Sequence, residues 1–315
     1  MQTIENQIIL APMEGVVDHL MRELLCEIND YDLCITEFIR VVDRMVPKQT
    51  FLKICPELEN KGFTKCGTPL RLQLLGQEPN WMAENALRAI ELGSNGVDIN
   101  FGCPSKTVNN SKGGAVLLKE PEQVYKIIQS VRSAVTESEQ VSAKIRLGFE
   151  DTSLFQEIVD AVFSANANSL TIHARTKKQG YIAPAYWHHI APITKNSKIP
   201  IYANGEIWTR QDAKNCIGSS NTTNLMLGRG ALAMPNLANI IKYNEAPMTW
   251  EHVAKMLERY SAKELKGDKS FYFSSRMKQW LRYLRLQHPK AEAFFQAIKT
   301  DKNKNTILEK LAESY

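Results

Sequence analysis

Polar or ionisable side chains follow almost every short apolar run in the first 230 residues. They are amides, carboxylates, one thiol, one imidazole and several cations, at Glu14, Glu37, Gln73, Asn100, Cys103, Lys144, Arg146, His173, Asn204, Glu206 and Arg229. Carboxyl, imidazole and thiol groups can transfer protons, and amides and cations can hold a planar ring that carries negative charge. If the runs are parallel strands, these groups meet at one edge, whereas small turn residues are expected at purely structural strand ends.

Glycines mark the ends of the last two runs. Gly205 follows the run at 201–203, and Gly228 and Gly230 flank Arg229 after the run at 224–227. A missing side chain leaves backbone N–H groups open to a phosphate, and Arg229 adds a guanidinium suited to a dianion. Two ordinary glycine turns are the alternative, but their joint position after the last two strands favours phosphate binding.

Lys144 and His173 lie on consecutive predicted strands. A buried lysine beside a cofactor ring could hold negative charge on a reduced flavin, and Gln73 could hydrogen-bond to the ring edge. A lone histidine is more often an ordinary core residue. The neighbouring Lys144 favours a site, because an inward lysine is costly without an anionic partner.

Cys103 lies in a Gly-Cys-Pro turn directly after the run at 97–100. It could be a nucleophile, a metal ligand, a proton donor or only a small turn residue. No His or Cys stands at metal-binding spacing around it, so the sequence predicts no metal site. A thiol of ordinary pKa is mostly protonated near neutral pH and can therefore donate a proton.

Eight β-branched or apolar runs alternate with helical patterns up to about residue 230, which indicates a parallel α/β fold. No G-x-G-x-x-G follows the first run, which argues against a dinucleotide-binding open sheet. We therefore predict a (β/α)₈ TIM barrel. The expected strands are 8–11, 33–38, 70–74, 97–100, 141–146, 169–173, 201–203 and 224–227, with helices such as 81–92, 121–135 and 155–165 between them.

The pattern changes after residues 244–247 and is only helical from Thr249 onward. Three helices are expected, over 250–265, over 274–287 and from about Ala291. We therefore predict two domains, a barrel at 1–245 and a small all-helical domain at 246–315.

The last fifth of the chain carries the whole positive excess. The net charge is +5, but residues 249–315 hold 14 Lys and Arg against 8 Asp and Glu, while residues 1–248 hold 25 against 26. Basic and aromatic side chains alternate there, at Arg276, Lys278, Trp280, Arg282 and Tyr283. This composition suits a phosphate backbone with stacked bases, although a solvated helical face has the same pattern.

The composition excludes fibrous, intrinsically disordered and membrane-spanning proteins. The 315 residues have 43% hydrophobic and 23% charged residues and a mean hydropathy of −0.30, which is typical of a globular protein. No apolar run approaches the roughly 18 residues of a membrane span, and the amino terminus lacks a secretory signal pattern. Six cysteines without a C-x-x-C pair form no disulfide framework. We expect a soluble protein of the reducing cytoplasm that does not bind membranes.

Several of these segments together resemble the tRNA-dihydrouridine synthases. The chain matches their motifs in order, from residue 11 to residue 232, and its helical end resembles their second domain. The segments Met-Glu-Gly at 13–15, YDLCITEF at 31–38 and RMKQWLRYL at 276–284 resemble the C-type bacterial members. The general motifs are APMEGV (11–16), NFGCPSKTVNNSKGGAVLL (100–118), KIRLG (144–148), HARTKKQGY (173–181), ANGEI (203–207) and GRGAL (228–232).

The resemblance implies FMN-dependent reduction of the uracil C5–C6 double bond in the tRNA D-loop, at position 16 for the C-type, with NADPH as the reductant. Cys103 matches the family's proton donor, which would protonate C5 after hydride from flavin N5 adds at C6. The residues that match the family's flavin site are Pro12, Met13, Glu14, Gln73, Lys144, His173, Asn204, Gly205, Glu206, Gly228 and Arg229.

This chemistry gives other residues expected roles toward tRNA. Asn100 and Arg146 could hold the uracil edge while charge builds on its carbonyl oxygen. A uridine within folded tRNA must flip out to reach a barrel mouth, so the basic helical domain would hold the tRNA. The expected tRNA contacts are Arg276, Lys278, Arg282 and Tyr283, with Arg40 and Lys106 at the barrel rim. We expect a monomer.

Two alternatives belong to other classes. A flavin barrel that reduces a small molecule, such as a dihydroorotate dehydrogenase or an ene-reductase, would not need the basic carboxyl-terminal region. A non-catalytic RNA-binding protein on a barrel scaffold would be colourless and insensitive to Cys103→Ala.

Overall fold

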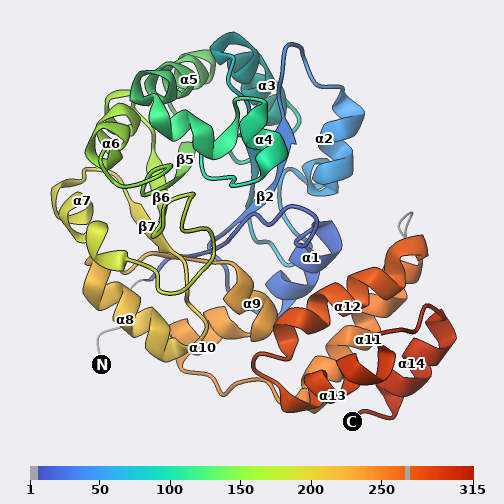
Figure 1. Cartoon of the computed structure of the whole chain (residues 1–315). Helices are drawn as coiled ribbons and strands as arrows, with labels where there is room; N and C mark the ends of the chain where they lie inside the picture. The colour runs from blue at the N-terminus through green and yellow to red at the C-terminus, as the bar shows by residue number, and fades with distance from the viewer. Residues whose placement is uncertain (1–5, 267–269) are drawn as a thin grey trace.

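The computed structural model describes residues 6–266 and 270–315, and its centre is a closed barrel of eight parallel strands (Figure 1). Every strand pairs with the next along the chain, and β1 pairs with β8. The predicted TIM barrel is therefore confirmed. Its strands are β1 (Ile8–Leu10), β2 (Leu33–Arg40), β3 (Leu70–Leu75), β4 (Val97–Asn100), β5 (Val141–Arg146), β6 (Ser169–His173), β7 (Ile201–Asn204) and β8 (Leu225–Leu227).

Helices surround the barrel because their apolar faces must cover the outer face of the sheet. The helices up to residue 243 are α1 (His19–Glu27), α2 (Lys48–Ile54), α3 (Pro79–Glu91), α4 (Lys106–Asn110), α5 (Pro121–Ala134), α6 (Phe155–Ser164), α7 (Ala191–Asn196), α8 (Arg210–Ser220), α9 (Arg229–Ala233) and α10 (Leu237–Tyr243). Short 3₁₀ turns occur at Pro56–Asn60, Gly114–Lys119, Trp187–His189 and Ser270–Tyr272.

The strand register brings the polar strand ends side by side. Asn100 on β4 lies opposite Lys144 on β5, and Arg146 lies opposite His173 on β6. His173 in turn lies opposite Asn204 on β7. Because parallel strands share a direction, these residues all face the carboxyl-terminal mouth of the barrel.

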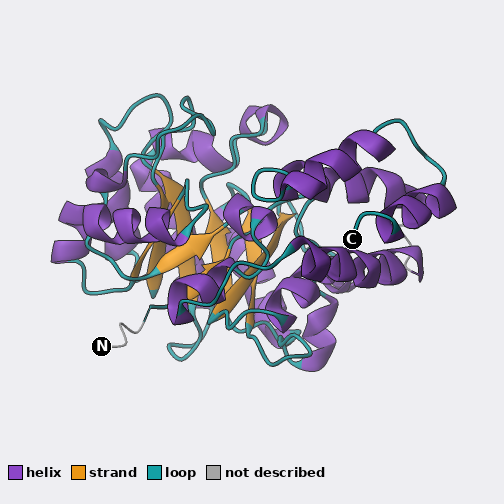
Figure 2. Cartoon of the chain, turned by 90° about the horizontal axis from the view of Figure 1, so that it is seen from below, coloured by secondary structure: helices purple, strands orange, loops and turns teal. Residues whose placement is uncertain are grey.

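The carboxyl-terminal region forms four helices that lie against one side of the barrel (Figure 2). The sequence predicted three of them and missed the last. Trp280 fixes the contact, because its buried indole donates to the Leu232 carbonyl of α9 at 3.2 Å and packs edge-on against Tyr260. The four helices are α11 (Trp250–Lys266), α12 (Phe273–Leu284), α13 (Pro289–Ile298) and α14 (Lys304–Ala312).

Most predicted boundaries lie within two residues of the observed ones. Helix α3 begins at Pro79, two residues before the predicted range 81–92, because a proline at the first helical position needs no N–H partner. Gly93 follows that helix with a φ of 107°, a backbone conformation that favours glycine. Within the described residues, no helix has the length and apolar character needed to cross a bilayer.

Candidate active site

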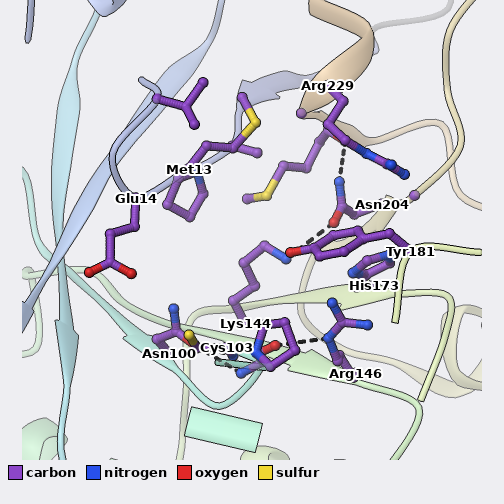
Figure 3. A pocket seen from close by; sticks show the side chains of 18 of the residues that line it. Met13, Glu14, Asn100, Cys103, Lys144, Arg146, His173, Tyr181, Asn204 and Arg229 are labelled. Carbon is purple, nitrogen blue, oxygen red and sulfur yellow. Dashed lines mark hydrogen bonds between the residues drawn. The ribbon is translucent and has the colours of Figure 1, made fainter. Parts of the chain in front are cut away.

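A cavity of about 580 Å³ opens at the carboxyl-terminal mouth of the barrel. Figure 3 shows Lys144 projecting into it, with Cys103 and Asn100 toward one side and Tyr181, His173 and Arg229 toward the other. The sequence-predicted residues that line the cavity are Pro12, Met13, Glu14, Gln73, Asn100, Cys103, Lys144, Arg146, His173, Asn204, Gly205, Glu206, Gly228, Arg229 and Tyr283.

Positive charge dominates one side of this cavity. Burial and the neighbouring Arg146 lower the pKa of Lys144 to about 8. Burial and the surrounding cations, of which Arg146 is the strongest, lower the pKa of His173 well below its ordinary value. His173 is therefore a neutral imidazole near pH 7, while the lysine and arginines around it attract an anion.

Lys144 is held toward Asn204, and the barrel backbone fixes the orientation of that amide. The Lys144 Nζ donates to Asn204 Oδ1 at 3.1 Å, and Asn204 Nδ2 donates to the Met226 carbonyl at 2.8 Å. Since the carbonyl can only accept, Asn204 must turn its oxygen toward the lysine.

Glu206 positions two arginines. Its Oε1 lies 2.7 Å from Arg175 and 2.6 Å from Arg229, and its Oε2 accepts from the Trp208 indole at 3.0 Å. Arg229 lies between two rings, 4.9 Å from the Tyr181 centroid and 5.0 Å from that of Trp208. The resemblance placed Glu206 in the flavin site, and its carboxylate, which pairs with two cations here, would repel a phosphate placed against it.

Two of the predicted glycines are sterically required. A side chain on Gly205, whose φ is 113°, would lie 2.8 Å from the His173 ring. One on Gly230 would lie 1.9 Å from the Ile207 carbonyl oxygen, so this glycine allows close backbone packing. A side chain added to Gly228 would have its nearest neighbours, on Ala11 and Met13, 3.7 Å away, so this glycine is not required by packing.

Cys103 is a half-buried thiol in a rigid turn. Burial raises its pKa above the ordinary value, so the thiol is protonated at neutral pH. Its backbone N–H donates to Asn100 Oδ1 at 2.9 Å, and its carbonyl accepts from Asn109 at the same distance. Gly114 packs so closely that an added side chain would lie 3.0 Å from the Cys103 Cβ. The thiol is thus suited to proton donation from a fixed position.

Asn100 and Arg146 have structural partners that the sequence did not predict. Asn100 bonds to its own turn and donates to Gln73 Oε1 at 2.8 Å. Arg146, 1% exposed, donates to the carbonyls of Gly102, Thr176 and Gly180 at 2.8–3.1 Å. Both line the cavity, but much of their hydrogen-bonding capacity is already used within the protein.

The predicted tRNA contacts lie in four kinds of environment. Arg40, Lys106 and Arg282 are exposed. Tyr283 lines the cavity, and Lys278 donates to the Asp301 carbonyl at 2.5 Å.

Arg276 lies in the interface between α12 and the barrel. Its side chain is only 11% exposed, it forms a 2.5 Å ion pair with Asp18, and it donates to the Gly15 carbonyl at 2.9 Å. Because the guanidinium bridges the helical region and the barrel, its position does not support the predicted phosphate contact.

Sequence reasoning assigned no role to Tyr181, Trp208, Arg175 or Asp98. Tyr181 and Trp208 line the cavity, Arg175 pairs with Glu206, and Asp98 lies beneath Gln73. The segment HARTKKQGY contains both Arg175 and Tyr181, so it held a usable signal. Nothing in local sequence distinguishes Asp98 from an ordinary strand residue. Among the described residues, no group of three or more metal-ligating side chains is placed to hold an ion.

Comparisons with known proteins agree with this geometry. Solved structures that resemble the chain include an old yellow enzyme homologue from Zymomonas mobilis and a 2-naphthoyl-CoA reductase. The first has a TM-score of 0.52 and 14% identity, covering 78% of this chain and 90% of that one. The second has a TM-score of 0.53 and 11% identity, covering 77% and 50%. At these identities the likeness concerns the barrel fold alone.

Sequence relatives are much more similar. A protein named tRNA-dihydrouridine(16) synthase from Shewanella oneidensis is 52% identical over 308 residues, 98% of each chain. Proteins of the same name from Escherichia coli K12 and Vibrio cholerae are 51% and 50% identical, covering 96% and 97% of this chain and 96% and 95% of their own. The family model described as dihydrouridine synthase matches residues 9–315. The chain therefore belongs to the dihydrouridine synthase family of enzymes.

Proposed function

We propose that this enzyme reduces the C5–C6 double bond of a uridine in the tRNA D-loop, at position 16, to 5,6-dihydrouridine. FMN is the cofactor, and NADPH is the reductant. The observation that carries the proposal is a protonated thiol, Cys103, that shares one cavity with a cationic, glycine-lined wall in a member of this family. The name shared by the similar relatives supports position 16.

The cavity fits a flavin mononucleotide by its chemistry. Gly205 lets the backbone lie against the His173 ring, and at Gly228 an added side chain would find its nearest atoms 3.7 Å away. Arg229 lines the cavity between the rings of Tyr181 and Trp208. These features suit the phosphate end. Lys144, buried and charged near pH 7, suits a ring on which negative charge builds. When bound, FMN would supply the hydride that adds to C6 of the uracil.

The residues of the chain handle the proton and the charge. After hydride addition, the substrate is an enolate across C4 and C5 and needs a proton at C5. Cys103 is protonated and lines the same cavity, so it can donate that proton. The thiolate that forms is stabilised by Arg146 and Lys144, the cations that interact electrostatically with Cys103. Cys103 then regains its proton from solvent.

The target uridine reaches the cavity after it flips out of the folded D-loop. We propose that the barrel at 1–245 carries the chemistry and the helical domain at 246–315 binds tRNA. Exposed Arg282 on α12 and exposed Arg40 and Lys106 at the barrel rim contact phosphates. We propose that the enzyme is a monomer. We also propose that it acts in the cytoplasm, where its tRNA substrate is available.

The test maps dihydrouridine in tRNA from cells that lack the enzyme and from cells complemented with wild type, Cys103→Ala or Cys66→Ala. Cys66 is an exposed thiol in the turn before β3 and serves as the matched control. We expect position 16 alone to lose dihydrouridine. Wild type and Cys66→Ala restore it, and Cys103→Ala restores it poorly, because that variant lacks the proposed proton donor.

Three results would contradict the proposal in distinct ways. Loss at another D-loop position would reject position 16 but keep the chemistry. Full complementation by Cys103→Ala would reject the proton donor. Unchanged dihydrouridine everywhere in a strain without a redundant enzyme would reject the tRNA substrate and favour a small-molecule flavin reductase.

A further inference from the structure

A chain of buried hydrogen bonds runs from the barrel interior to the turn that carries Cys103. Asp98 Oδ2 accepts from Gln73 Nε2 at 2.7 Å, and Gln73 Oε1 accepts from Asn100 Nδ2 at 2.8 Å. Asn100 Oδ1 then accepts the N–H groups of Gly102 and Cys103, both at 2.9 Å. Polar side chains of two neighbouring strands, β3 and β4, are thereby linked in series with the turn that follows β4.

The two ends of this chain dictate its direction. An ionised carboxylate can only accept, and two backbone N–H groups can only donate. Gln73 must therefore turn its Nε2 toward Asp98, and Asn100 must turn its Oδ1 toward the turn. A flipped Gln73 amide would place two acceptors against each other at Asp98 and two donors against each other at Asn100.

The strand register puts Asp98 where it can do this. Asp98 pairs with Gln73 on β3 and with Ser142 on β5, and it is 1% exposed. Ser142 Oγ donates to the second carboxylate oxygen at 2.6 Å. Burial raises the pKa of Asp98 above its ordinary value. The hydrogen bonds from Gln73 and Ser142 and the charges of Arg71 and Lys144 act in the opposite direction and favour the ionised carboxylate.

We infer that Asp98 is a positioning residue for the reductase reaction. Its carboxylate sets the orientation of the Gln73 amide, and through Asn100 it fixes the turn that holds the Cys103 thiol. With one Nε2 hydrogen on Asp98, Gln73 has one N–H left to present toward a cofactor ring, so the floor of the cavity offers a donor there. Asp98 lines no part of the cavity itself. The inference rests on the proposed function for the roles of Gln73 and Cys103.

The first test follows the Cys103 turn without cofactor or tRNA. In a Cys66→Ala background the other four cysteines are buried, so Cys103 is the accessible thiol. Alkylation by iodoacetamide is timed in Asp98→Ala, Asn100→Ala and the double variant, with surface Asp160→Asn as control. We expect each single change to speed labelling by about fivefold, the factor for one lost hydrogen bond. The double variant should be no faster than Asn100→Ala, because Asp98 acts through Asn100.

The conservative variant Asp98→Asn distinguishes the hydrogen-bond acceptor from the negative charge, because asparagine keeps the bulk and one acceptor oxygen. Its Oδ1 can still accept from Gln73 while its Nδ2 donates to Ser142, so labelling should stay within about twofold of wild type. If the melting temperature shows that Asp98→Ala does not fold, the comparison of Asp98→Asn with wild type and Asn100→Ala still tests the inference. Multiplicative effects in the double variant, or labelling of Asp98→Asn as fast as that of Asp98→Ala, would overturn the inference.

The second test uses the cofactor. FMN affinity, followed by quenching of flavin fluorescence, should fall about tenfold in Asp98→Ala and less in Asp98→Asn, because only the alanine variant frees the Gln73 amide to rotate. Equal affinity in wild type and Asp98→Ala would reject the role toward Gln73. If wild type forms no dihydrouridine, the proposed function fails, but the labelling contrast still decides the inference about the turn.

Discussion

The cavity and the α12 surface carry the same types of basic side chain, but they differ in what surrounds the charge. Lys144 and Arg146 are buried among other cations, with backbone and amide groups as their partners. On α12, Arg276 is paired with Asp18, whereas Arg282 is exposed. A count of basic residues therefore says little about anion binding. What matters is where the cation lies: Arg276 is buried against Asp18 in the interface, whereas Arg229 pairs with Glu206 but still lines the cavity.

The largest effect is expected for Lys144→Met. The variant removes the buried cation while keeping its bulk, so FMN-dependent formation of dihydrouridine should fall by about two orders of magnitude or more. Its melting temperature should not fall, because a buried charge with a lowered pKa is a burden on the fold. Turnover and thermal melts check this, with exposed Lys126→Met on α5 as the control. Turnover near wild type would show that Lys144 is not part of the site.

Arg276→Gln should mainly affect stability. It removes an ion pair with Asp18 and a hydrogen bond to Gly15 at the interface, so the free energy of unfolding should fall by about 2 kcal/mol. Arg285→Gln, which breaks a more exposed pair with Glu292, should change it by less than about 0.5 kcal/mol. Urea titration measures both. Unchanged stability combined with a large loss of tRNA affinity would restore Arg276 as an RNA contact.

The pH dependence of FMN binding tests whether the buried charge of Lys144 attracts the cofactor, in contrast to the exposed charge of Arg282 on α12. The pKa of Lys144 is about 8, so the group is charged below that pH and neutral above it. Affinity should therefore be constant from pH 6.5 to 7.5 and weaken by up to about tenfold per pH unit above 8. Lys144→Met should be flat over the same range. Fluorescence titrations check this, and an equal fall in the variant would assign the titration to another group.

The smallest effect is expected for Arg282→Gln. An exposed cation that contacts one phosphate should weaken tRNA binding by a few fold and reduce the slope of log affinity against log salt by about 1. The melting temperature should not change, because no salt bridge of Arg282 exists among the described residues. Binding curves at several salt concentrations test this against Arg88→Gln on α3. An unchanged slope would remove Arg282 from the RNA surface.

Much of the fold and the membership of the site could be predicted because both depend on local pattern. All eight strands were expected within two residues of their observed ends, since buried parallel strands are continuous apolar runs. The wider errors lie where local signals are weak. Helix α14 was missed, and β2 continues to Arg40 past a register shift between Ile35 and Phe38.

The partners of each side chain could not be predicted. The resemblance placed Glu206 in the flavin site, but no local pattern showed that it pairs with Arg175 and Arg229 from other strand ends. Asp98 has no motif of its own, and its importance follows only from its register opposite Gln73.

By itself the sequence determined the barrel, its helical appendage, the family, and the residue types at the barrel mouth. Periodicity and turn chemistry act over a few residues, so they are readable along the chain. Only the tertiary structure decided which charges are paired, which amides are fixed, and that Arg276 joins α12 to the barrel. Those outcomes depend on distances between residues far apart in sequence, such as Arg276 and Asp18, which only packing sets.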